Sequence, residues 1–223
     1  MGYNVGPPPG PRPTRRPPPG LKRGRKLNWA DTSVPWKGLV GEVSAEKIAA
    51  HAHAEAGQDY GGRPYLHHIR QVVAVLTEFG YHDDETLQAG YLHDTIEDTE
   101  LTMDKLLELG FAPATIRAVL FCTDEEGRNR KIRKARTYER MTREVRAHPE
   151  DPEVIRGVRV KLADRIANVR YCIATKDKGL FKMYQKDAPF AAALQHTGIC
   201  DEMWAEYERL MVEGLGSSVM ILE

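Results

Sequence analysis

The chain has 223 residues, enough to bury one substantial hydrophobic core, and its 32 basic and 32 acidic residues balance one another. Seven of the basic residues and no acidic ones lie within residues 1–26, so the rest of the chain has a net charge of −7, which excludes a general nucleic-acid binder. The three widely spaced cysteines fit neither a disulfide framework nor a zinc ribbon, and no apolar run approaches the ~20 residues of a membrane span. We therefore expect a soluble, cytoplasmic protein with no membrane association.

The first residues are unlike the rest, since residues 1–20 contain eight of the fourteen prolines together with four glycines. Such a composition cannot bury enough apolar surface to offset its chain entropy. We expect a disordered or loosely docked basic segment over residues 1–39, one folded domain over residues 40–216, and a C-terminal tail over residues 217–223.

Helix signals follow one another along the folded part. Ser44 is a typical N-cap residue, and Pro64 suits the first turn of a helix that ends at Gly80. The pattern predicts helices over 44–57, 64–80, 85–98, 102–109, 112–123, 137–147, 152–173, 180–186 and 201–214, with a basic loop and helix start at 127–134. No segment alternates with period two and none repeats, so we predict an all-α fold, a single helical bundle.

The stretch His93-Asp94-Thr95-Ile96-Glu97-Asp98 carries the strongest chemical signal. On one continuous helix, His93 and Glu97 share a face, as do Asp94 and Asp98. Three carboxylates this close together are unfavourable unless a cation neutralises them. A divalent metal ion is the natural candidate, and the alternative is a solvated acidic helix end.

Two further motifs contain residues suited to complete such a site. Tyr65-Leu66-His67-His68 lies near a helix start, and Asp164 lies among aliphatic residues one turn before Asn168. A buried aspartate is costly unless it is paired or ligates a metal.

Together these motifs resemble the HD-type hydrolase domain of RelA/SpoT proteins, and in particular the small stand-alone alarmone hydrolases. The resemblance covers about residues 44–200 and rests on Tyr65 to His68, on His93 to Thr99, and on Lys161-Leu162-Ala163-Asp164-Arg165 with Asn168. It implies an HD-domain helical bundle, with nothing that resembles the family's synthetase domain.

The resemblance also implies a set of site residues. The family's metal ligands, usually of Mn²⁺, match His68, His93, Asp94 and Asp164, with His67 as the alternative to His68. Glu97 and Asp98 match the carboxylates that handle the nucleophilic water. A metal lowers the pKa of a water ligand from 15.7 towards about 7, and a carboxylate that takes its proton contributes roughly a hundred- to ten-thousand-fold in rate.

Substrate contacts follow from the same resemblance. The expected residues are Gln58, Arg130, Arg133, Lys134, Arg165, Asn168 and Tyr184, with a solvated helix start as the alternative for the basic run. One departure from the family concerns recognition of the nucleobase. After the residues that match Gly57-Gln58, the family often has a basic pair, whereas this chain has Asp59-Tyr60. The preference for guanosine is therefore open.

The leading hypothesis is a metal-dependent 3′-pyrophosphohydrolase acting on hyperphosphorylated nucleotides such as ppGpp or ppApp. One alternative is an antitoxin-type hydrolase that removes adenosine alarmones made by a toxic synthetase or diphosphate from the 3′ end of tRNA. Others are a different HD nucleotide or NADPH phosphatase, and a degenerate HD domain used only for binding. Retention of all presumed ligands together with Glu97 and Asp98 disfavours the last. The oligomeric state is left open.

Overall fold

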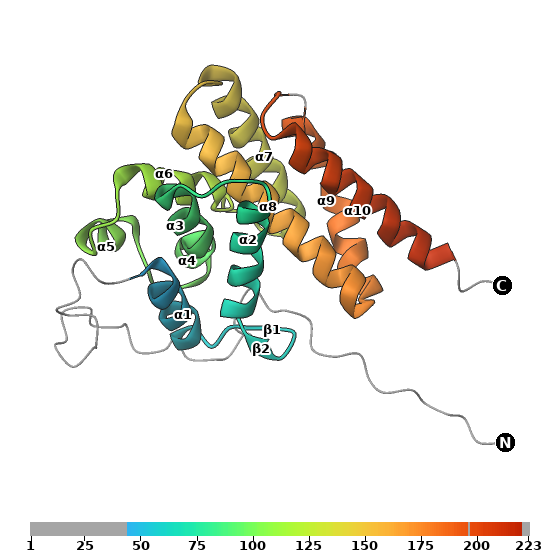
Figure 1. Ribbon diagram of the computed structural model, residues 1–223, viewed down its shortest axis with the longest axis horizontal. Helices are drawn as coiled ribbons and strands as arrows, with labels where there is room; N and C mark the ends of the chain where they lie inside the picture. The colour runs from blue at the N-terminus through green and yellow to red at the C-terminus, as the bar shows by residue number, and fades with distance from the viewer. Residues whose placement is uncertain (1–43, 196, 220–223) are drawn as a thin grey trace.

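The computed structural model describes residues 44–195 and 197–219 of the chain (Figure 1). The predicted tail over residues 1–39 and the last residues, 220–223, lie outside this described part. The described residues are mostly helical, with one very small two-stranded sheet, which confirms the predicted fold class.

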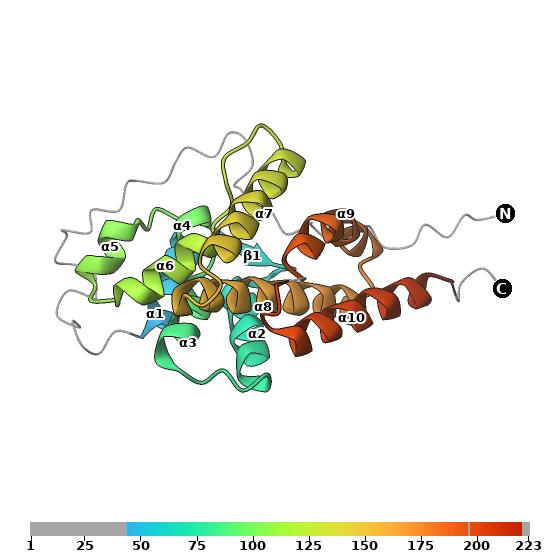
Figure 2. The ribbon, with the colours of Figure 1, turned by 90° about the horizontal axis from the view of Figure 1, so that it is seen from above.

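Helix α8 (Pro152–Thr175) is the central element, and it packs against α2, α3, α6, α7, α9 and α10 (Figures 1 and 2). It starts at Asp151, whose side chain accepts a hydrogen bond from the amide of Glu153, and Pro152 occupies its first turn. It ends at Thr175, and the next residue, Lys176, adopts a left-handed conformation. Because α8 is buried along most of its length, polar residues on it need partners inside the protein.

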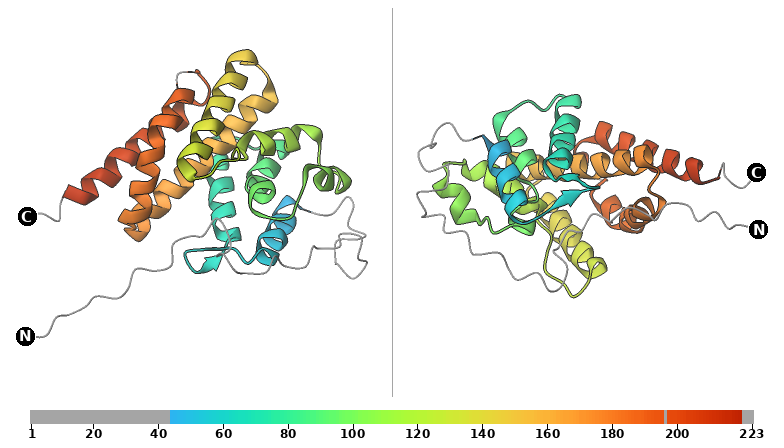
Figure 3. Two further views of the ribbon diagram at one scale, coloured as in Figure 1. Left: turned by 180° about the vertical axis from the view of Figure 1, so that it is seen from behind. Right: turned by 90° about the horizontal axis from the view of Figure 1, so that it is seen from below.

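One end of α8 is covered by the first half of the chain (Figure 3). This half comprises α1 (Ala45–Glu55), the antiparallel strands β1 (Asp59–Tyr60) and β2 (Arg63–Pro64), α2 (Leu66–Glu78), α3 (Asp84–Leu92), α4 (Thr95–Asp98), α5 (Met103–Glu108) and α6 (Pro113–Cys122). The apolar face of α2 is fully buried against α3 and α8, as its helical periodicity predicts.

The other end of α8 is covered by the second half of the chain. Helix α7 (Arg130–Ala147) packs on α9 (Lys178–Gln195), and α10 (Asp201–Val219) runs along α8 (Figure 2). No helix in the described ranges is both long enough and apolar enough to cross a membrane.

The sequence predictions and the structure differ in five respects. The helix predicted over 85–98 is interrupted at His93 and Asp94, which separate α3 from α4. Helix α7 begins at Arg130 rather than at residue 137, because Asn129 caps it by accepting a hydrogen bond from the amide of Ile132. Helix α9 extends well beyond residues 180–186, and α10 extends beyond its predicted end at residue 214. The short hairpin of β1 and β2 was not predicted, since two-residue strands have no detectable period.

Candidate active site

The motif at residues 93–98 lies at a corner between two helices. Helix α3 ends at Leu92, and the backbone of Asp94 (φ −102°, ψ −2°) starts the single turn of α4. The Thr95 hydroxyl donates to the carbonyl of Leu92 at 2.7 Å, which satisfies an acceptor left open at the end of α3. The corner places His93 and Asp94 against α8, so both ligand candidates are buried.

Four of the predicted residues converge there from three parts of the chain. His68 Nε2 lies 3.3 Å from Asp164 Oδ1 and 4.0 Å from Asp94 Oδ2. His93 Nε2 lies 3.2 Å from Asp94 Oδ2 and 3.9 Å from Asp164 Oδ1. All four side chains are buried, and we call His68, His93, Asp94 and Asp164 the ligand cluster. His67, the alternative, is half-buried outside this ligand cluster, where its Nε2 lies 3.4 Å from the guanidinium of Arg63.

The nitrogen atoms of the ligand cluster are suited to a metal. In the neutral form of His93, Nδ1 donates to the carbonyl of Gly90 at 2.8 Å, so that Nε2, which faces the carboxylates, carries the lone pair that a metal needs. Neither His93 Nε2 nor His68 Nε2 forms a hydrogen bond within the described residues, although both are buried. Ligand atoms of His68, His93 and Asp94 lie within 4.8 Å of one another. Two imidazoles and two carboxylates form a donor set that fits a divalent transition metal.

The electrostatics of the ligand cluster favour positive charge at its centre. Burial disfavours the charged form of both histidines, and at His68 this effect prevails and lowers the pKa. At His93 burial also lowers the pKa, but the carboxylates of Asp94 and Asp164 outweigh it and raise the pKa to about 9. The two carboxylates therefore attract a cation to the point where the histidine nitrogens meet.

A first group of supporting residues orients Asp94. The Tyr65 hydroxyl donates to Asp94 Oδ2 at 2.5 Å, and the ring of Tyr65 packs on His53 with centroids 4.4 Å apart. His53 is buried, which lowers its pKa to about 4 and keeps it neutral, and its Nδ1 donates to Gln58 Oε1. Gln58, predicted to contact substrate, is thus a buried partner of His53 in this structure.

A second group orients Asp164. The amide nitrogen of Asn168 donates both to the carbonyl and to the carboxylate of Asp164. Its Oδ1 accepts hydrogen bonds from the Tyr60 hydroxyl at 3.0 Å and from the Tyr184 hydroxyl at 2.7 Å. These bonds use all four positions of the amide, so a nucleotide contact by Asn168 would have to replace one of them. Tyr60 also stacks on His68, with ring centroids 4.7 Å apart.

The two predicted catalytic carboxylates lie on α4, one turn after the ligands. Glu97 and Asp98 are both half-buried. Glu97 Oε2 accepts a hydrogen bond from the backbone amide of Asp124 at 3.1 Å, while Oε1 has no hydrogen-bond partner in the described part of the chain. The arrangement leaves one oxygen of Glu97 available for a water molecule or a proton.

The predicted basic residues have different surroundings. Arg130 and the buried Arg165 both pair with the carboxylate of Asp187, and Arg165 Nε donates to the Tyr138 hydroxyl at 2.9 Å. Lys134 is fully buried. The guanidinium of the half-buried Arg133 forms no hydrogen bond or ion pair within residues 44–195 and 197–219.

Sequence reasoning missed several residues that hold the site together. Tyr60 and Tyr65 were not assigned a role, although Tyr65 stands within the motif that includes His68. Asp124 and Lys161 were also missed. A lysine one turn before a buried aspartate in α8 was the available signal, because a buried ammonium requires a nearby carboxylate.

A cavity of about 450 Å³ opens beside Asp124, between α6, α7 and the start of α8. Its lining has five carboxylates and two guanidiniums, those of Arg117 and Arg140. This excess of negative charge disfavours a polyphosphate.

Comparison with known proteins identifies the family. An HD domain family model matches residues 45–187, more than half of the chain. The chain is 35% identical over 131 residues to the mouse protein named guanosine-3′,5′-bis(diphosphate) 3′-pyrophosphohydrolase MESH1, covering 57% of this chain and 67% of that protein. It is 31% identical over 177 residues to a protein of Aquifex aeolicus named guanosine-3′,5′-bis(diphosphate) 3′-pyrophosphohydrolase, covering 70% of this chain and 24% of that protein.

A solved structure has the same fold. It is described as a metazoan ortholog of SpoT that hydrolyses ppGpp, and it aligns with a TM-score of 0.56 at 22% identity over 78% of this chain and 93% of that chain. The likeness in fold and the matched family model confirm the resemblance drawn from the motifs. This protein therefore belongs to the HD domain family.

Proposed function

We propose that this chain is a metal-dependent 3′-pyrophosphohydrolase of ppGpp-type nucleotides. The observation that carries the proposal is the buried ligand cluster of His68, His93, Asp94 and Asp164, whose two Nε2 atoms form no hydrogen bond with any described residue. Glu97, on the helical turn that follows Asp94, is held by the backbone amide of Asp124. The names of the mouse and bacterial relatives support the same reaction.

The reaction divides among the residues of this chain. A divalent ion, when bound by the ligand cluster, supplies Lewis acidity and lowers the pKa of a water ligand. Glu97 accepts a proton from the attacking water through its unengaged oxygen, with Asp98 beside it. The water oxygen attacks the phosphorus next to the 3′ oxygen, the P–O3′ bond breaks, and a proton passes to O3′. The products are pyrophosphate and a nucleotide with a free 3′ hydroxyl.

The identity of the metal, one phosphate contact and the cellular location are also proposals. We propose Mn²⁺ as the ion, because two imidazoles and two carboxylates suit such a metal. We propose Arg133 as the phosphate contact, because its charge has no internal partner among the described residues. We further propose a cytoplasmic enzyme.

The hairpin of β1 and β2 favours a second candidate substrate, one whose nucleobase is not guanine. Where a basic pair is expected, Asp59 accepts a hydrogen bond from the amide of Gly62 and closes the turn, and the buried Tyr60 packs on His68. Neither residue supplies a positive charge to a guanine. An adenosine alarmone such as ppApp is therefore the second candidate substrate.

The test is to incubate the purified protein, stripped of metal and then given Mn²⁺ or Mg²⁺, with ppGpp, ppApp, NADPH and 3′-pyrophosphorylated tRNA. We expect pyrophosphate release from ppGpp or ppApp that requires the added ion. Release of inorganic phosphate from NADPH alone would contradict the proposal, and cleavage of the tRNA alone would favour the antitoxin-type alternative. Turnover of none of these substrates would favour a binding role.

A further inference from the structure

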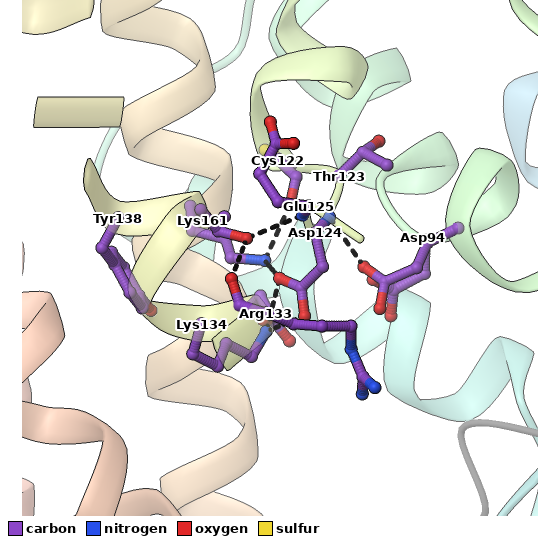
Figure 4. Close-up of polar contacts among 12 residues, drawn as sticks. Asp94, Cys122, Thr123, Asp124, Glu125, Arg133, Lys134, Tyr138 and Lys161 are labelled. Carbon is purple, nitrogen blue, oxygen red and sulfur yellow. Dashed lines mark hydrogen bonds and ion pairs between the residues drawn. The ribbon is translucent and has the colours of Figure 1, made fainter. Parts of the chain in front are cut away.

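Lys134 and Lys161 surround the carboxylate of Asp124. Lys134 Nζ, from α7, lies 2.6 Å from Asp124, and Lys161 Nζ, from α8, lies 3.6 Å from Asp124 Oδ1. Figure 4 shows both lysine side chains converging on Asp124, while the guanidinium of Arg133 points away from them. All three side chains are at most 3% exposed. We call Lys134, Asp124 and Lys161 the lysine–aspartate cluster.

This cluster is neutralised by its own residues. Burial by itself lowers the pKa of Lys161, but the carboxylates of Asp124 and Asp164 outweigh it and raise the pKa above the usual lysine range. Both ends of the Lys134–Asp124 pair are inside the protein, so a substrate phosphate would have to compete with a formed ion pair. Such a pair is costly to break, because its removal leaves a buried charge.

The cluster fixes the backbone around Asp124. Lys161 Nζ donates to the carbonyl of Cys122 at 2.8 Å, two residues before Asp124. The amide of Glu125, one residue after it, donates to the Thr137 hydroxyl at 2.8 Å. The amide between these two anchors, that of Asp124, donates to Glu97 Oε2. Side-chain and backbone contacts therefore set the direction in which this amide holds Glu97.

We propose that Lys134 and Lys161 are positioning residues that clamp Asp124 and so hold its backbone amide on the carboxylate of Glu97. The inference rests on the proposed function, in which Glu97 accepts the proton of the attacking water. It assigns Lys134 to the support of Glu97 rather than to the substrate phosphates.

The first test is steady-state kinetics of Lys134→Met, which keeps the length of the side chain and removes its charge. We expect kcat to fall roughly ten- to a hundred-fold, as for other small misplacements of a catalytic group, with KM changed by less than about three-fold. Lys131→Met, on an exposed position of the same helix, is the matched control and should match the wild type. A large rise in KM with kcat retained would assign Lys134 to substrate binding and overturn the proposal.

The second test is a double-mutant cycle with Glu97→Gln. If Lys134 acts through Glu97, Lys134→Met should lower kcat little further when Glu97 is already replaced. Effects that multiply in the double variant would overturn the proposal. Should Lys134→Met fail to fold, as judged by thermal unfolding, Lys161→Met is used in its place. It leaves Asp124 paired with Lys134, and the same dependence on Glu97 is expected.

The third test needs no substrate and no activity. The amide resonance of Asp124 in the ¹⁵N-labelled metal-free protein should move upfield in Lys134→Met and in Glu97→Gln, because its hydrogen bond weakens in both. An unmoved resonance in both variants would overturn the positioning role even if the enzyme is active. If the wild type hydrolyses no alarmone but the resonance moves as expected in both variants, only the proposed function is contradicted.

Discussion

Two buried charged clusters lie side by side in this protein, and they differ in what balances their charge. In the ligand cluster, His68 and His93 lie 3.2 to 4.0 Å from the carboxylates, and their Nε2 atoms form no hydrogen bond in the described part of the chain. In the lysine–aspartate cluster, the protein supplies its own cations, and Lys134 lies 2.6 Å from Asp124. A cluster whose carboxylates face imidazole nitrogens is suited to bind a metal cation, and a cluster whose carboxylate is paired with lysines is suited to hold a neighbouring group in place.

The largest effect is expected from His68→Ala, which removes one ligand. We expect the protein to lose its bound metal and activity to fall by roughly a thousand-fold or more, since the pKa of water then returns towards about 15.7. Metal content by mass spectrometry and pyrophosphate release measure the two effects. His67→Ala is the matched control, because His67 lies outside the ligand cluster beside Arg63. The reverse result would mean that His67 is the ligand.

The next-largest effect distinguishes the proposed metal ligands from the proposed catalytic base, Glu97. Glu97→Gln keeps the shape of the side chain and removes its basicity, so kcat should fall by roughly a hundred-fold or more while the metal is retained. Asp94→Asn should instead lose metal and activity together. Activity and metal content measured on both variants decide between the two roles. Near wild-type turnover by Glu97→Gln would leave Asp98 as the remaining carboxylate for the water.

A smaller effect is expected from a residue that donates a hydrogen bond to a proposed ligand. Tyr65→Phe removes the hydroxyl that donates to Asp94 at 2.5 Å, so metal affinity should fall by about ten- to a hundred-fold. Competition with a chelator of known affinity measures this. Tyr91→Phe is the control, because Tyr91 is half-exposed and its hydroxyl forms no hydrogen bond in the described residues. Equal metal affinity in Tyr65→Phe and wild type would show that the Tyr65–Asp94 bond does not support the ion.

The smallest effect concerns the packing that brings Asp124 to Glu97. A Cβ atom added at Gly157 of α8 would lie 2.5 Å from the ring of Phe121, near the end of α6. Gly157→Ala should therefore lower the free energy of unfolding by about 1–3 kcal/mol, as overpacking does. Denaturant unfolding measures it. Gly216→Ala, where an added Cβ meets nothing within 4 Å, should be neutral or slightly stabilising.

Much of the fold followed from local signals. Capping residues such as Ser44 and Thr102 and the apolar period of α2 predicted where helices begin and which faces are buried. The break between α3 and α4 was not predicted, because no proline or glycine marks it. The corner persists because Asp94 accepts a hydrogen bond from Tyr65, at the start of α2, and His93 Nε2 lies 3.9 Å from Asp164 of α8.

The sequence by itself determined the helical class and predicted which residues would bind a metal, because ligand chemistry depends on residue types in short motifs. Only the tertiary structure decided which basic residues face outward. Arg133 and Lys134 are adjacent in the sequence and equally charged, yet successive residues of a helix point about 100° apart. That rotation directs Lys134 to a carboxylate on a neighbouring loop and leaves Arg133 without an internal partner among the described residues. The position of that carboxylate depends on how α6 and α8 pack, which no local pattern encodes.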